Sequence, residues 1–319
     1  MILSSEILTL YILNGLFLFF ASIALYLSIK IVLHWDPNAT TKLQYRLENY
    51  SYLSATIVKF IFAIKVPLFI FFIFTLDKLS NIISGAMCGA GVVDATTYGS
   101  YILLLKVLNL YLFAYWIVLN KQDSQFKLQP YVKQKFMLFI ALYILLVSEI
   151  VLESLMFGAI DLESVVDCCG VIYSSSSGTY IASVLALDTT LLLSLFYGVF
   201  LLIALAYYYR VKYLFSILNL LFIIISLVTL IAFFGTYIYE LPTHKCPFCF
   251  LQKEYNYVGY GLYISLFIGT FNGLVLAFIE FTEKESEKFY KLSLLFNLLY
   301  TLSVTYYPVM FYIKNGVWL

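Results

Sequence analysis

The chain has 319 residues, of which 63% are apolar and only 12% are charged. Soluble globular domains average about half apolar and a quarter charged residues, so this composition excludes a soluble protein and indicates an integral membrane protein. The net charge of +1 offers no basic field that would attract nucleic acid.

Apolar runs of about 20 residues, the length that crosses a bilayer as a helix, recur along the whole chain. They predict an all-α, polytopic integral membrane helical bundle and leave no polar stretch long enough for a soluble domain, so we expect a single transmembrane domain over residues 1–319. Strands are not expected, because continuous apolar runs do not show the alternation of a membrane barrel. The eight expected helices cover about 7–33, 52–76, 99–120, 136–157, 181–207, 213–239, 257–280 and 291–313.

The orientation follows from the Lys and Arg residues at alternate helix ends, because the richer side is cytoplasmic. Twelve lie at one side: Lys30, Lys42, Arg46, Lys121, Lys127, Lys133, Lys135, Arg210, Lys212, Lys284, Lys288 and Lys291. Four lie at the other: Lys78, Lys245, Lys253 and Lys314. We therefore expect a cell (inner) membrane protein with both termini, and the loops 77–98, 158–180 and 240–256, on the extracytoplasmic side.

All five cysteines fall in these three outer loops: Cys88 in the first, Cys168 and Cys169 in the second, Cys246 and Cys249 in the third. Unpaired cysteines are usually scattered through apolar interiors, so their confinement to one oxidising side points to disulfides, redox chemistry or metal binding.

A faint threefold repetition supports grouping the loops. Each loop runs from a cysteine to a Gly-x-Tyr at the next helix, at Gly99, Gly178 and Gly261. Glycine in loops and tyrosine at membrane interfaces also explain this pattern, but the loops are expected to converge.

The third loop contains His244-Lys245-Cys246-Pro247-Phe248-Cys249. A disulfide across four residues stabilises a fold by only about 2 kcal/mol, so a purely structural staple is better placed elsewhere. The C-x-x-C spacing instead suits a disulfide that opens and closes locally, or two thiolates on one metal. Cys246 is expected to be the attacking thiol, because first cysteines of such motifs are generally the more exposed and Lys245 favours its thiolate.

The four residues Cys246-Pro247-Phe248-Cys249 resemble the active-site motif of glutaredoxins, over those four positions only. No βαβ pattern surrounds them, so a thioredoxin-type fold is not implied. In function rather than in sequence, paired cysteines on an outer loop of a helical bundle are similar to those of the DsbB and VKOR families of disulfide-generating membrane enzymes. Eight spans and cysteines in three loops depart from both families.

Cys168 and Cys169 are adjacent, and adjacent cysteines join each other only with backbone distortion. One is expected to pair with Cys88, which leaves the other to exchange with Cys246 or Cys249. Alternatively all five stay reduced and hold a soft metal such as Cu(I), with His244 as a further ligand.

Several ionisable residues lie inside the predicted helices, where each costs several kcal/mol unless it is paired or hydrated. Lys106, Glu149, Glu153 and Asp188 fall in the outer half of the membrane, and Lys65 is near mid-depth. One interpretation is that the lysines pair with the acids and fix helix packing. The other is a proton path or a quinone pocket in which Lys106, Glu149, Glu153 and Asp188 bind the cofactor.

The sequence therefore predicts a membrane thiol-disulfide redox protein that exchanges with an extracytoplasmic thiol protein and passes electrons to a quinone or another membrane carrier. Enzymatic activity, as a thiol-disulfide oxidoreductase, follows from that hypothesis alone. A second hypothesis is a Cu or Zn binder, with His244, Cys246 and Cys249 as ligands, that serves metal transport or assembly. The third is a structural subunit of a larger membrane complex.

Overall fold

The computed structural model describes residues 4–36, 39–126, 129–161, 165–166 and 187–319. These residues form helices and loops with no β-strand among them, which confirms the all-α class. Eight helical segments of this described part are long and apolar enough to cross a membrane, as predicted. The chain is therefore a multi-pass protein of the lipid bilayer.

The α-helices are α1 (Ser5–His34), α2 (Lys42–Ser80), α3 (Gly89–Asp94), α4 (Gly99–Asp123), α5 (Val132–Ala159), α8 (Thr189–Tyr208), α9 (Lys212–Thr229), α10 (Gly235–Tyr239), α11 (Val258–Phe278) and α12 (Glu283–Asn315). A π-helical segment, η1 (Leu230–Phe234), joins α9 to α10 so that Lys212–Tyr239 forms one span. Two 3₁₀ turns, η2 (Cys249–Leu251) and η3 (Lys253–Tyr255), precede α11.

Two helix starts differ from the sequence prediction. Helix α2 begins at Lys42 rather than near 52, because Thr41 caps it and its side chain accepts a hydrogen bond from the Gln44 N–H at 3.2 Å. The fifth helix is predicted to begin at 181, and residues 181–186 lie outside the described residues. Within the described part it begins at Thr189, where Asp188 caps it.

Packing divides the chain into two compact units. The first contains Met1–Ile83 and Val92–Ser164, and its long helices α1, α2, α4 and α5 each pack against two others of the four. Its core includes Phe62, whose ring stacks on Phe113 at 4.2 Å between centroids. The outward faces are apolar too, as at the exposed Phe19 and Leu104, which suits lipid contact.

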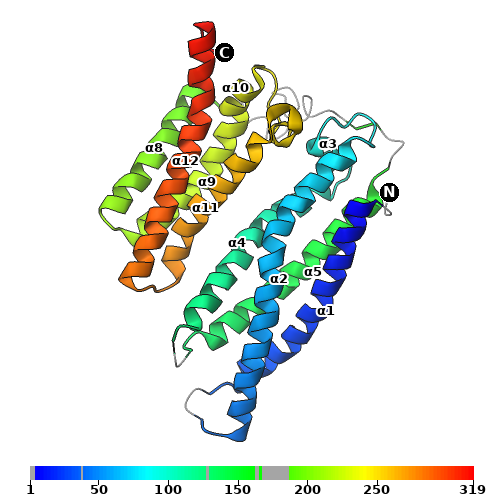
Figure 1. The fold of residues 1–319 in the computed structure, drawn as a ribbon, viewed down its shortest axis with the longest axis vertical. Coiled ribbons are helices and arrows are strands. Elements are labelled where there is room, and N and C mark those ends of the chain that lie inside the picture. Colours follow the sequence, from blue (N-terminus) through cyan, green and yellow to red (C-terminus); the bar gives the residue numbers. More distant parts are fainter. Residues whose placement is uncertain (1–3, 37–38, 127–128, 162–164, 167–186) are drawn as a thin grey trace. The chain divides into compact units, whose positions relative to one another are not determined.

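The second unit contains Ser84–Gly91 and Val165–Leu319. Helix α8 packs on α9, α9 on α11, α11 on α12 and α12 on α8, so this unit is also a ring of four spans (Figure 1). The segment Ser84–Gly91 belongs to it although it follows α2 in the chain. That the units act as a single domain over 1–319 stays a prediction.

Candidate functional site

The hairpin between α10 and α11 is held in shape by two tyrosine hydroxyls from the flanking helices. Tyr239, the last residue of α10, donates its hydroxyl to the Cys246 carbonyl and accepts the Phe250 N–H at 3.1 Å. Tyr263 of α11 donates to the Pro247 carbonyl at 2.8 Å. The backbone on both sides of the C-x-x-C pair is therefore fixed by buried or half-buried hydrogen bonds.

The start of α11 also packs closely against the hairpin. At Gly259 an added Cβ would lie 2.5 Å from a ring carbon of Phe250 and 2.8 Å from a methyl of Leu251. Such contacts are far inside van der Waals distance, so only glycine fits without displacing η2.

Cys88 is carried to the hairpin by the segment Ser84–Gly91. The Gln252 side chain donates to the Met87 carbonyl at 3.1 Å, and the Val166 N–H donates to the Ser84 carbonyl at 3.0 Å. Gly85 has φ +87, and a side chain there would strike the backbone of Val166. These contacts set the position of Cys88 just before α3.

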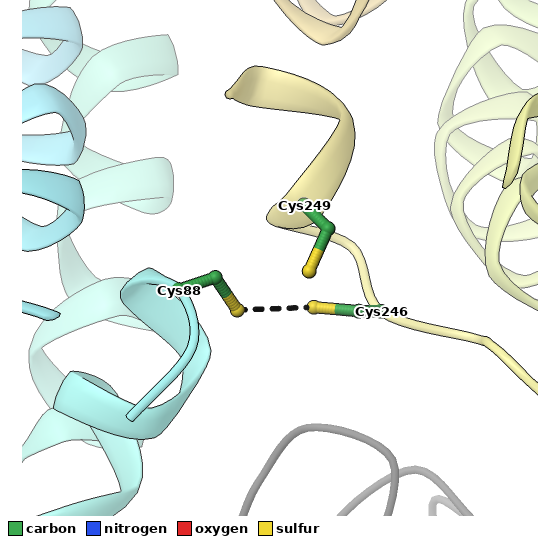
Figure 2. Close-up of side chains that lie close together, drawn as sticks. All are labelled: Cys88, Cys246 and Cys249. Atoms are coloured by element: carbon green, nitrogen blue, oxygen red, sulfur yellow. Dashed lines mark hydrogen bonds between the residues drawn. The ribbon is translucent and has the colours of Figure 1, made fainter. Parts of the chain in front are cut away.

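Cys88, Cys246 and Cys249 form one compact thiol cluster (Figure 2). Their sulfurs all lie within 4.8 Å of one another, and the Cys88 and Cys246 sulfurs are 3.4 Å apart. The residues are 0%, 1% and 5% exposed in that order. No disulfide joins them in this structure. The cluster is thus buried and is close enough for sulfur to react with sulfur, or for one ion to contact all three.

The Cys246 sulfur also accepts a hydrogen bond from the Phe248 N–H at 3.4 Å. An N–H donor stabilises negative charge on sulfur, which favours the thiolate that both disulfide exchange and metal binding need. The expectation that Cys246 is the more exposed of its pair is wrong, because the Tyr239 bond draws its backbone inward.

The first and third cysteine loops therefore converge as predicted, since Cys88 lies beside Cys246 and Cys249. Cys168 and Cys169 lie outside the described residues, and so do their predicted pairings. His244 is half-buried with its ring edge-on to Tyr239, and its Nε2 is buried without a hydrogen-bond partner among the described residues. His244 does not belong to the group of potential metal ligands that the three cysteine sulfurs form.

The first unit holds the other predicted polar cluster. Glu149 Oε1 lies 3.0 Å from Lys65 Nζ and 2.8 Å from Lys106 Nζ, and Glu153 Oε2 lies 2.6 Å from Lys106 Nζ. All four groups are buried, and a small cavity touches Lys65, Lys106 and Glu149. The charges cancel pairwise, so the structure brings together Lys106, Glu149 and Glu153 as an ion-paired centre, and Lys65 joins them.

Two asparagines complete this centre and were missed by the sequence reasoning. Asn14 donates to Glu153 Oε1 at 2.9 Å and accepts from Lys65 Nζ at 2.8 Å, and Asn109 donates to Glu149 Oε2 at 2.6 Å. The available signal was Asn109 three residues after Lys106, a spacing that places both side chains on one helix face.

Asp188 is not part of the ion-paired centre. It is exposed, in the second unit, where its carboxylate accepts the Leu191 N–H at 3.2 Å as the N-cap of α8. The prediction that it lies within the fifth helix is wrong, because a carboxylate at this position satisfies an otherwise unpaired helix N–H.

Comparison of the chain with protein-family models, with curated proteins and with solved structures gives no match. The class that the fold and the site define is a multi-pass helical membrane protein with a buried three-thiol cluster, suited to redox chemistry or to metal binding.

Proposed function

We propose that this chain is a membrane thiol-disulfide redox protein in which Cys246 and Cys249 take electrons from an extracytoplasmic dithiol protein. The observation that supports this proposal is the 3.4 Å separation of the Cys88 and Cys246 sulfurs, beside Cys249. Disulfide exchange needs a thiolate to reach a disulfide sulfur. A third thiol is already in contact with the C-x-x-C pair, so a disulfide passes between them with small side-chain movements.

The first half-reaction starts from a Cys246–Cys249 disulfide. A thiolate of the partner attacks the Cys246 sulfur, forms a mixed disulfide and releases the Cys249 thiolate. The second thiol of the partner then resolves the mixed disulfide and releases Cys246. The partner becomes a disulfide and the hairpin pair becomes a dithiol, with two electrons transferred.

The second half-reaction passes these two electrons to a carrier in the membrane. The Cys246 thiolate attacks Cys88 of a disulfide between Cys88 and Cys168 or Cys169, which releases the latter as a thiolate. Cys249 then displaces Cys88 and restores the Cys246–Cys249 disulfide. A quinone accepts the two electrons and two protons of the resulting dithiol and reforms the second disulfide.

Burial of the cluster adds a condition to this cycle. With Cys246 only 1% exposed, a protein thiol cannot reach its sulfur until the hairpin opens. Between α10 and Cys246, the residues Leu241, Pro242 and Thr243 are exposed. We therefore place the opening in this part of the hairpin, and exchange depends on partner docking there.

The test is a trapping experiment in native membranes. In a Cys249→Ser variant, the Cys246 thiolate attacks the disulfide form of the partner and forms a mixed disulfide, which releases the partner's other sulfur as a thiolate. Attack of Cys246 on Cys88 of the second disulfide competes with this reaction, so an internal Cys88–Cys246 disulfide is expected beside the adduct. In a Cys88→Ser/Cys249→Ser variant the internal route is gone, and we expect a larger yield of the intermolecular adduct. Non-reducing gels and mass spectrometry of the linked peptides measure both products.

The matched control is Cys88→Ser/Cys246→Ser, which leaves Cys249 alone in the cluster and is expected to trap much less partner. If neither double variant forms an adduct, and oxidised wild-type protein contains no Cys246–Cys249 disulfide, the redox proposal is wrong. That result would favour the structural-subunit hypothesis.

A further inference from the structure

The position of Cys88 gives the cluster more sulfur ligands than a redox pair requires. Three thiolates bound to one ion at about 2.3 Å lie roughly 3.8 Å apart in tetrahedral geometry and roughly 4.0 Å apart in a trigonal plane. The observed separation of 3.4 Å between the Cys88 and Cys246 sulfurs is slightly shorter than these values, and the other two sulfur pairs lie within 4.8 Å. Shifts of less than about 1 Å per sulfur would therefore complete a three-sulfur ion site.

The surroundings of the cluster select the kind of ion. No histidine or carboxylate of the described residues joins the three sulfurs in a group of potential ligands. Soft thiolates prefer Cu(I) or Zn(II), and Zn(II) almost always takes a fourth ligand. Cu(I) is satisfied by three thiolates alone. A buried donor set of three sulfurs thus matches Cu(I) better than Zn(II).

We propose that Cys88, Cys246 and Cys249, when reduced, bind one Cu(I) ion in a trigonal three-thiolate site. The Phe248 N–H, 3.4 Å from the Cys246 sulfur, offsets part of the thiolate charge. Binding needs the same thiols as the redox proposal but does not depend on thiol exchange. A Cys246–Cys249 disulfide removes two of the three ligands, so the oxidised protein cannot hold the ion.

The experiment uses the full-length protein in detergent, reduced and kept without oxygen, with Cu(I) supplied from a chelator of known affinity. We expect about one Cu(I) per chain and a copper-edge X-ray absorption spectrum with sulfur neighbours only. Cys88→Ser should lower Cu(I) affinity by at least tenfold. The same variant keeps Cys246 and Cys249, so it should still form their disulfide on oxidation.

The control is Cys168→Ser/Cys169→Ser, which should retain the bound Cu(I) because neither residue belongs to the three-sulfur site. Loss of Cu(I) in this control, or unchanged affinity in Cys88→Ser, would overturn the proposal. Uptake of Zn(II) in preference to Cu(I) would overturn the assignment of the ion. Circular dichroism of each variant shows whether its helices are intact. Disulfide formation without Cu(I) binding leaves the redox proposal standing, so the two proposals fail separately.

Discussion

Tyr239 makes two hydrogen bonds that fix the shape of the thiol hairpin. Its hydroxyl connects the Cys246 carbonyl to the Phe250 N–H, so one side chain fixes the backbone at both ends of the C-x-x-C motif. Removing it leaves a buried donor and a buried acceptor unpaired, which typically costs about 1–3 kcal/mol for each group. The sulfurs should then become accessible through local opening of the hairpin.

We expect Tyr239→Phe to raise the rate at which a small maleimide labels the reduced cluster by roughly tenfold, the equivalent of about 1.4 kcal/mol of local opening. Tyr237→Phe is the matched control, because its hydroxyl accepts the Leu319 N–H and makes no bond to the hairpin among those described. Equal labelling rates in both variants would show that Tyr239 does not hold the hairpin closed.

At the scale of single residues, the sequence predicted that Cys88 lies near Cys246 and Cys249, but it did not predict that these cysteines are buried. Polar neighbours such as His244 and Lys245 suggest an exposed hairpin, whereas Phe248, Phe250 and Leu251 are buried together with the cysteines. The hydrogen bonds from Tyr239 and Tyr263 to the hairpin could not be predicted either, because tyrosine near a helix end is equally typical of a membrane interface. Hydrogen bonds between residues that are distant in sequence depend on the tertiary fold.

At the scale of helices, the ion-paired centre joins all four spans of the first unit. Lys106 of α4 forms ion pairs with both acids of α5, while Lys65 of α2 and Asn14 of α1 complete the contacts. Buried pairs of this kind contribute little net stability compared with apolar residues, but breaking one side of a pair leaves an uncompensated charge.

Lys106→Met should therefore destabilise the protein by about 3–5 kcal/mol, because Glu153 loses its lysine partner. Adding Glu153→Gln removes the unpaired charge and should recover part of that loss. Lys291→Met is the control, since this side chain is 63% exposed in its pair with Glu287, and its effect should stay within about 0.5 kcal/mol. Unfolding in detergent measures all three. A double variant less stable than Lys106→Met would contradict this account.

The helices themselves were well predicted, since apolar runs set them independently of tertiary contacts. The helix ends were predicted less well, because capping residues determine where a helix begins and ends. Thr41 extends α2 into a polar stretch, and Asp188 caps α8 instead of lying within the helix. Pairing of Lys106 with Glu149 and Glu153 was one of two interpretations of the sequence. The sequence gives the charge of these residues and their depth in the membrane, but it does not give the side-chain conformations that bring them together.

At the scale of the molecule, the two units share one topology of four successive spans in a ring. In both, the loop between the second and third spans carries cysteine: Cys88 follows α2, and Cys246 with Cys249 follows α10. The sequence suggested a threefold repeat of loops. That threefold repetition stays a prediction, and the packing shows that the two units have the same order of four spans.

The charge pattern also predicts how the chain is oriented in the membrane. The span Lys212–Tyr239 has 28 residues, about 42 Å at 1.5 Å per residue, so its two ends lie on opposite membrane faces. Tyr209 lies just before one end and the thiol hairpin follows the other. The excess of Lys and Arg predicts that the Tyr209 end faces the cytoplasm.

The native thiols are too buried to report this orientation, so single cysteines are needed at exposed sites in a cysteine-free background. Met87 and Tyr209 are both 69% exposed, which makes them a matched pair. A membrane-impermeant maleimide should label Met87→Cys in intact cells and Tyr209→Cys only after the membrane is opened. The reverse pattern would place the thiol cluster in the cytoplasm, where glutathione keeps thiols reduced, and would remove the oxidising environment on which the redox proposal depends.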